Sequence, residues 1–124
     1  MVTYGSHAMC FSRMEINVLR DAIMRLARKK GWGTKPKEVH FAEKIALIHS
    51  EASEALEAYR KHNITGRDSV TEELTDILMR VVHLAGIYNI DLEKEVMKKM
   101  KRNATRDWSN DRLYVDKRKK SIPR

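Results

Sequence analysis

Cysteine, proline, glycine and aromatic residues are all scarce in this sequence. It has one cysteine, two prolines, five glycines and 6% aromatic residues. A single Cys10 excludes an internal disulfide framework and a cysteine-based zinc site. The shortage of turn formers and aromatics argues against a β-sandwich or barrel and favours helices. No stretch approaches about 18 uncharged apolar residues, so we expect no transmembrane helix. No signal peptide is visible, so a cytoplasmic location is the default expectation.

The length of 124 residues suits one domain. Residues 1–8 include GSHA at positions 5–8 and are interpreted as a cloning remnant. We expect a helical domain over residues 9–106 and a basic C-terminal tail over residues 107–124. The net charge of +8 is unevenly distributed, because acids gather between Glu38 and Asp76 and bases from Lys94 onward. A metal–phosphate substrate would suit such a division, whereas a solvated terminus explains the basic tail equally well.

Apolar residues recur at helical spacing in four segments. The sequence therefore predicts an all-α fold, a four-helix antiparallel bundle-like domain completed by oligomerisation. Ser12 with Glu15, and Ser69 with Glu72, have the spacing of N-terminal capping boxes, and Gly31 follows three cations as a helix stop. The four predicted helices span Arg13–Lys30, Lys37–His62, Ser69–Tyr88 and Asp91–Arg106.

The second and third segments each carry a predicted core stripe. The short connection between these two helices indicates an antiparallel pair. Further apolar residues on other faces, at Met79, Ile87 and Met97, favour burial against a second copy of the chain. The stripe of the second segment is Phe41, Ile45, Ile48, Ala52, Leu56 and Tyr59; that of the third is Leu74, Ile77, Leu78, Val81, Ala85 and Tyr88.

Two pairs of acids border these stripes. Residues three apart on a helix lie about 60° from each other, so each pair shares one flank of its helix. In an antiparallel pair the four carboxylates would converge, and their repulsion would require cations. Oxygen ligands of this kind suit magnesium (Mg²⁺) or manganese (Mn²⁺). The alternative is ordinary surface acids paired with lysines. A di-iron site is disfavoured because no histidine has a glutamate three residues before it. The four acids are Glu51, Glu54, Glu73 and Asp76.

The fourth segment carries cations instead. Lys99, Asn103 and Arg106 occupy one stripe of the predicted helix at i, i+4 and i+7. Two cations and an amide in this arrangement can hold phosphate oxygens. A solvated basic helix end is the competing interpretation.

The stretches EASE, EELTD and KMKRNATR, in this order and spacing, resemble the MazG-like all-α nucleoside triphosphate pyrophosphohydrolases from Ala42 to Arg106. The resemblance implies metal-dependent cleavage of a (d)NTP to the (d)NMP and pyrophosphate by a metal-activated water. It also implies a homodimer or a dimer-based homotetramer. Glu51, Glu54, Glu73 and Asp76 would hold the metal, and Glu54 would orient or deprotonate the water. Lys99, Asn103 and Arg106 would bind substrate, with Trp32 or His40 stacking on the base.

Two other functions stay open at this point. Phosphoribosyl-ATP pyrophosphohydrolase shares the helical fold and the metal logic. A helical nucleic-acid-binding or adaptor protein would explain the positive net charge, and it would bind DNA or RNA in a salt-sensitive manner without divalent metal. Four aligned acids would repel a phosphate backbone, which makes a nucleic-acid partner the weaker expectation.

Overall fold

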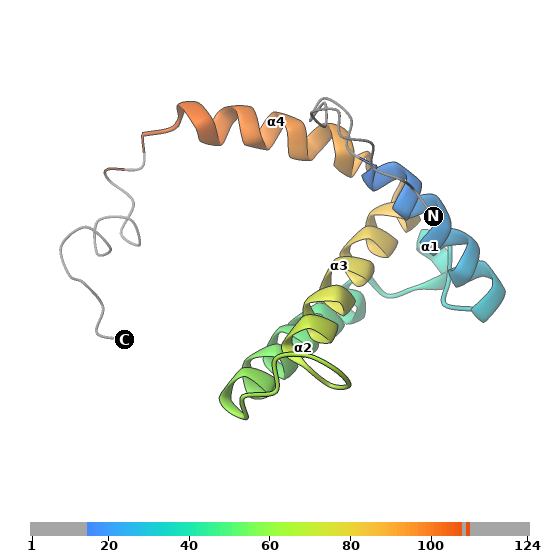
Figure 1. Cartoon of the computed structure of the whole chain (residues 1–124). Coiled ribbons are helices and arrows are strands. Elements are labelled where there is room, and N and C mark those ends of the chain that lie inside the picture. Colours follow the sequence, from blue (N-terminus) through green and yellow to red (C-terminus); the bar gives the residue numbers. More distant parts are fainter. Residues whose placement is uncertain (1–14, 108, 110–124) are drawn as a thin grey trace, which may run out of the picture. The chain divides into compact units, whose positions relative to one another are not determined.

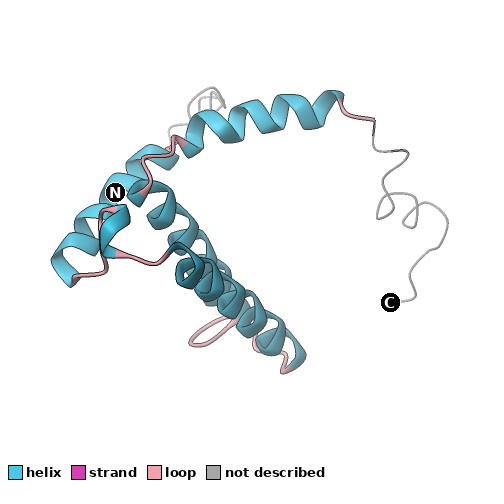
Figure 2. Ribbon diagram, turned by 180° about the vertical axis from the view of Figure 1, so that it is seen from behind, coloured by secondary structure: helices cyan, strands magenta, loops and turns pink. Residues whose placement is uncertain are grey.

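A computed structural model describes residues 15–107 and 109 of the chain. Within these residues the structure contains four α-helices, one short 3₁₀ helix and no strand (Figures 1 and 2). The four helices and the absence of a strand in this part of the chain confirm the predicted all-α fold class. None of the described helices is long and apolar enough to cross a membrane. In chain order the elements are α1 (Ile16–Lys30), η1 (Pro36–Glu38), α2 (Phe41–Arg60), α3 (Val70–Ile87) and α4 (Leu92–Thr105).

The chain divides into two compact units, Met1–Glu93 and Lys94–Arg124. The first unit contains α1, α2 and α3, and the second contains most of α4. In the first unit α2 and α3 make the most extensive helix–helix contact, and α1 packs mainly on α3. Figure 1 shows α2 and α3 running side by side, joined by the loop at one end. The antiparallel pairing predicted from the short connection is thus confirmed.

Local signals account for two of the helix ends, the end of α1 and the start of α3. Gly31 adopts a left-handed φ of 73° after α1, and its N–H donates to the carbonyl of Ala27. Ser69 caps α3, because its side chain accepts the N–H of Glu72. The predicted cap at Ser12 lies outside the described residues. Glu15 occupies the N-cap position of α1 without a side-chain cap bond, so the prediction that the helix already includes Glu15 was wrong.

The interior of the first unit overlaps only in part with the predicted core stripes. Ala58 on α2 and Val82, Leu84, Ala85 and Ile87 on α3 are buried. Ala85 belongs to the predicted stripe of α3, whereas most of the predicted stripe of α2 is exposed, which corrects the sequence prediction for α2. Ile87, predicted to be buried against a second copy of the chain, is already only 4% exposed within one chain. The stripe residues that are at least half exposed are Phe41, Leu56, Tyr59, Leu74 and Leu78.

The physical reason is that α2 has apolar residues over a broad arc. A helical wheel measures the angle between residues, but it does not say whether a neighbour is in the same chain or in another. The structure uses the flank that carries Glu51 and Ala58 for packing within the chain. This choice brings Glu51 of α2 and Glu73 of α3 to the inside of the helix pair.

A close crossing of α1 and α3 depends on Gly86. A Cβ placed on Gly86 would lie 2.6 Å from the sulfur of Met24 and 3.3 Å from Cγ of Arg20. Any larger residue would therefore push the two helices apart or displace Met24. This crossing lies in the same unit as the acids and fixes the position of α1 beside α3.

Candidate active site

Three of the four predicted acids converge between α2 and α3. One carboxylate oxygen from each of Glu51, Glu54 and Glu73 lies within 4.8 Å of the others. Glu51 and Glu54 are one turn apart on α2, and Glu73 faces them from the first turn of α3. Residues Glu51 and Glu73 are 6% and 8% exposed, whereas Glu54 is exposed. The oxygen-only ligand set and this spacing fit a hard divalent cation such as Mg²⁺ or Mn²⁺.

Asp76 lies beside this group rather than within it. It is half-buried, one turn after Glu73 on α3, and it lines the neighbouring pocket. Its charge still contributes to raising the pKa of Glu73. The structure therefore brings three predicted ligands together and places the fourth at the edge of the same acidic surface.

The pKa values of Glu73 and Glu51 are shifted in opposite directions, because burial and repulsion raise the first and hydrogen bonds lower the second. The pKa of Glu73 is raised to about 7 by burial, by its hydrogen bond with Glu51 and by the charges of Glu54, Glu51 and Asp76. Burial alone would also raise the pKa of Glu51. The hydrogen bond from Arg80, with smaller contributions from Glu73 and Glu54, lowers the pKa of Glu51 below its ordinary value instead. Near neutral pH Glu73 is thus partly protonated, while Glu51 stays ionised.

Arg80 is the cation that stabilises this cluster. Its Nε donates to Oε1 of Glu51 at 2.6 Å. The side chain of Arg80 is 38% exposed and that of Glu51 is 9% exposed. The ion pair therefore joins the buried acids to the more open surface of the unit. A buried charge retains its ionised form at low cost only when such a partner is present.

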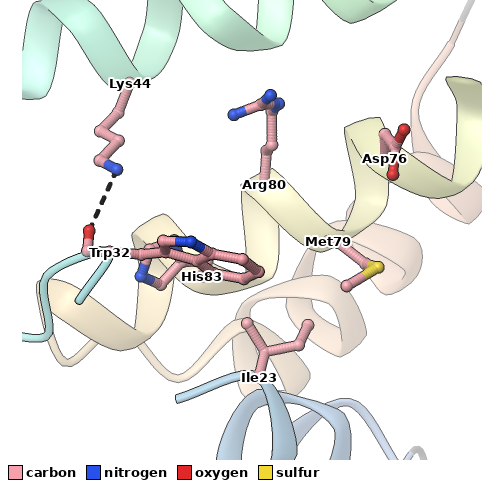
Figure 3. Close-up of a pocket in the computed structure, with 7 residues that line it drawn as sticks. All are labelled: Ile23, Trp32, Lys44, Asp76, Met79, Arg80 and His83. Atoms are coloured by element: carbon pink, nitrogen blue, oxygen red, sulfur yellow. Dashed lines mark hydrogen bonds between the residues drawn. The ribbon is translucent and has the colours of Figure 1, made fainter. Parts of the chain in front are cut away.

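A pocket of about 390 Å³ lies next to the acids (Figure 3). Figure 3 shows the rings of Trp32 and His83 close together at one end, Asp76 at the other end and Arg80 between them. Arg80 projects from α3 toward α2. The pocket combines an aromatic end, an acidic end and two cationic side chains. Its lining residues are Ile23, Trp32, Lys44, Asp76, Met79, Arg80 and His83.

Backbone contacts hold the aromatic end in place. The Nζ of Lys44 donates to the carbonyl of Trp32 at 3.3 Å, and Nε2 of His83 donates to the carbonyl of Gly33 at 2.8 Å. The ring centroids of Trp32 and His83 are 6.4 Å apart at an angle of 58°. Trp32 itself is 45% exposed. Its indole is thus anchored through the loop backbone while the ring remains accessible to a ligand.

The predicted substrate-binding residues of the last helix belong to the second unit. Lys99 and Asn103 lie on α4, and Arg106 follows the end of that helix. Lys99 and Arg106 are exposed, and Asn103 is half-buried. The predicted helical stripe thus holds for Lys99 and Asn103, whereas Arg106 lies just beyond the helix, and the role of all three toward a substrate stays a prediction.

Three pocket residues were not assigned a role from the sequence. Arg80 lies seven residues after Glu73 on α3, and Lys44 lies seven residues before Glu51 on α2. Seven residues are about two helical turns, so each cation shares a helix face with an acid. That spacing from a metal-ligand candidate is the signal that identifies them. His83, the third of these residues, is 7% exposed and also lines the pocket.

Comparison with known proteins identifies the domain. The family model of the MazG nucleotide pyrophosphohydrolase domain matches residues 41–108, which is more than half of the chain and includes all four acids. No curated protein and no solved structure matches the chain. The family match agrees with the all-helical fold and with the acid cluster on α2 and α3. The chain belongs to the MazG nucleotide pyrophosphohydrolase family.

Proposed function

We propose that this protein is a metal-dependent nucleoside triphosphate pyrophosphohydrolase that cleaves a (d)NTP between the α and β phosphates. The observation that carries the proposal is the convergence of Glu51, Glu54 and Glu73 within 4.8 Å, inside a MazG domain and beside a pocket. Ordinary surface acids would not be buried beside each other, as Glu51 and Glu73 are. A divalent ion gives these three carboxylates a common partner.

The four acids divide into structural and accessible ligands. Glu51 and Glu73 are buried, and they would fix the position of Mg²⁺ or Mn²⁺ from opposite helices. Glu54 is exposed. It would orient or deprotonate the attacking water as general base. Asp76, at the edge of the pocket, would hold the ion from the substrate side. When bound, the ion would neutralise the charge that develops on the phosphates and lower the pKa of a water.

The pocket supports a nucleotide as substrate. The accessible ring of Trp32 at one end can stack on a base, while Asp76 at the other end is beside the acids that would carry the metal–phosphate. For Lys99, Asn103 and Arg106 we propose binding to phosphate or sugar oxygens, the role that the resemblance implied. Cleavage needs no covalent nucleophile from the chain in this scheme.

We further propose that the chain forms a homodimer or a dimer-based homotetramer. The exposed apolar residues of α2 and α3 support a second copy of the chain as the partner. A paired helix surface of this kind is self-complementary under a two-fold axis, because each copy presents the same two helices. Burial of these side chains would supply the apolar contact that a small first unit lacks. A cytoplasmic location stays a prediction from the sequence.

A substrate panel tests the reaction. NTPs, dNTPs and phosphoribosyl-ATP are incubated with Mg²⁺, and released pyrophosphate is scored against orthophosphate. We expect pyrophosphate from at least one nucleoside triphosphate, whereas turnover of phosphoribosyl-ATP alone would favour the related activity. Orthophosphate alone, or no metal-dependent turnover combined with salt-sensitive binding to DNA or RNA in chelator, would reject the proposal.

Two substitutions assign the roles within the site. Glu54→Gln should lower kcat by orders of magnitude with the fold intact, because the water is activated only in the transition state. Glu57→Gln, on the exposed face of the same helix, is the matched control and should leave kcat unchanged. Lys99→Ala should chiefly raise KM, since a phosphate contact exists in the ground state as well. Near-normal kcat for Glu54→Gln would exclude it as the general base.

A further inference from the structure

Arg80 has one partner in the acid cluster and a second surface in the pocket. Its Nε is bonded to Glu51, whose side chain is only 9% exposed. Arg80 also lines the pocket, where it lies between Asp76 and the aromatic end formed by Trp32 and His83. A single side chain thus reaches both the proposed metal ligands and the space proposed for substrate.

A divalent ion and Arg80 would compete for the carboxylate of Glu51. A divalent ion held by Glu51, Glu54 and Glu73 would be within a few ångströms of the guanidinium that neutralises the same carboxylate. Like charges at such distances repel strongly where water is partly excluded. Binding of the ion would therefore weaken the bond between Arg80 and Glu51. The guanidinium would then need a different anion.

The pocket is the place where such an anion would arrive. A substrate that stacks on Trp32 and reaches the metal near Asp76 must carry its phosphates past Arg80, which lies between the two ends. A guanidinium presents several N–H donors in one plane, and this geometry matches the oxygens of a phosphate. Lys44, the other cation of the pocket, is bonded to the backbone of Trp32 at the aromatic end.

We propose that Arg80 exchanges partners: it neutralises Glu51 in the metal-free protein and turns to a phosphate oxygen of the substrate once a divalent ion is bound. The inference rests on the proposed function. It makes Arg80 a substrate-binding residue whose availability depends on the metal. It also explains how buried acids persist without the ion, since Arg80 supplies the missing positive charge.

The exchange predicts that loss of the Arg80 charge raises the affinity for a divalent ion and lowers the affinity for a phosphate ligand. Arg80→Met keeps the apolar stem and removes the charge. By calorimetry, this variant should bind Mn²⁺ alone at least about threefold more tightly than wild type, because a repelling cation has gone. With Mg²⁺ saturating, it should bind inorganic triphosphate about tenfold more weakly. Inorganic triphosphate is the probe because it contains the phosphates without a base.

Two further variants separate this effect from damage to the fold. Arg80→Lys retains the charge, so Mn²⁺ affinity should stay near the wild-type value, whereas triphosphate affinity should fall because the planar fork of donors is lost. Arg25→Met, at an exposed position of α1, should change neither affinity. Loss of affinity for both ligands in Arg80→Met would mean that Arg80 only maintains the structure, and would overturn the exchange.

The same measurements distinguish the inference from the proposed function. If wild type binds no Mn²⁺, the metal site itself is wrong. If wild type binds Mn²⁺ and the Arg80→Met variant binds it equally well or less well, the metal site stands and the exchange fails. Unchanged triphosphate affinity in both Arg80 variants would also overturn it, since Arg80 would then have no contact with phosphate.

Discussion

Proton release on metal binding tests the raised pKa of Glu73. At a pKa of about 7 the carboxyl is largely protonated at pH 6 and largely ionised at pH 8. A metal ligand must be deprotonated, so binding displaces whatever proton remains. We expect about 0.9 proton released per ion at pH 6 and about 0.1 at pH 8. Below pH 7 the apparent metal affinity should fall by about tenfold per pH unit.

The ionisation of Glu73 should also make the stability of the metal-free protein depend on pH. The folded pKa of Glu73 lies above the ordinary value of 4.5, so the folded chain keeps a proton that the unfolded chain releases. Between about pH 4.5 and about pH 7 the free energy of unfolding should therefore decrease as the pH rises. Saturating Mg²⁺ should remove this decrease, because the ion takes the place of the proton.

Calorimetric titration with Mn²⁺ in two buffers of different ionisation enthalpy counts the released protons. Glu73→Gln should abolish the difference between pH 6 and pH 8. Glu57→Gln, whose carboxylate is exposed and paired with Lys61, should preserve it. Equal proton release at the two pH values in wild type would refute the reasoning, because Glu73 would then not titrate between pH 6 and pH 8.

Three further predictions concern stability and assembly. Ser69→Ala removes a fully buried hydroxyl that caps α3, so chemical denaturation should show a loss of about 1 kcal/mol or more; an unchanged midpoint would mean that the cap contributes nothing. Gly86→Ala gains about 1 kcal/mol of helix propensity but meets the sulfur of Met24, at a cost of about 1–3 kcal/mol. We expect a net loss that disappears when the same change is made in a Met24→Ala background; a loss that persists there would place the strain elsewhere. Leu78→Asp should shift light scattering toward the monomer, whereas Val18→Asp, at an exposed position of α1, should not; a stable wild-type monomer at micromolar concentration would contradict the proposed assembly.

The sequence by itself determined the helices and the meeting of the acids. Spacings of three and four residues place Glu51 and Glu54 on one flank of α2, and a short connection with a serine cap at Ser69 requires α3 to run back along it. These are local constraints that hold whatever else the chain does. They suffice to bring Glu73 opposite the acids of α2, as the structure confirms.

Only the tertiary structure decided which flank is interior and what surrounds the acids. Leu56 and Leu78 were assigned to the core, yet the structure exposes both side chains and buries the flank of α2 that carries Glu51. The angle between residues is local, whereas burial depends on which surfaces meet across the whole unit. The same holds for Arg80. Its bond to Glu51 spans 29 residues of sequence, and it exists because two helices pack at a particular rotation about their axes.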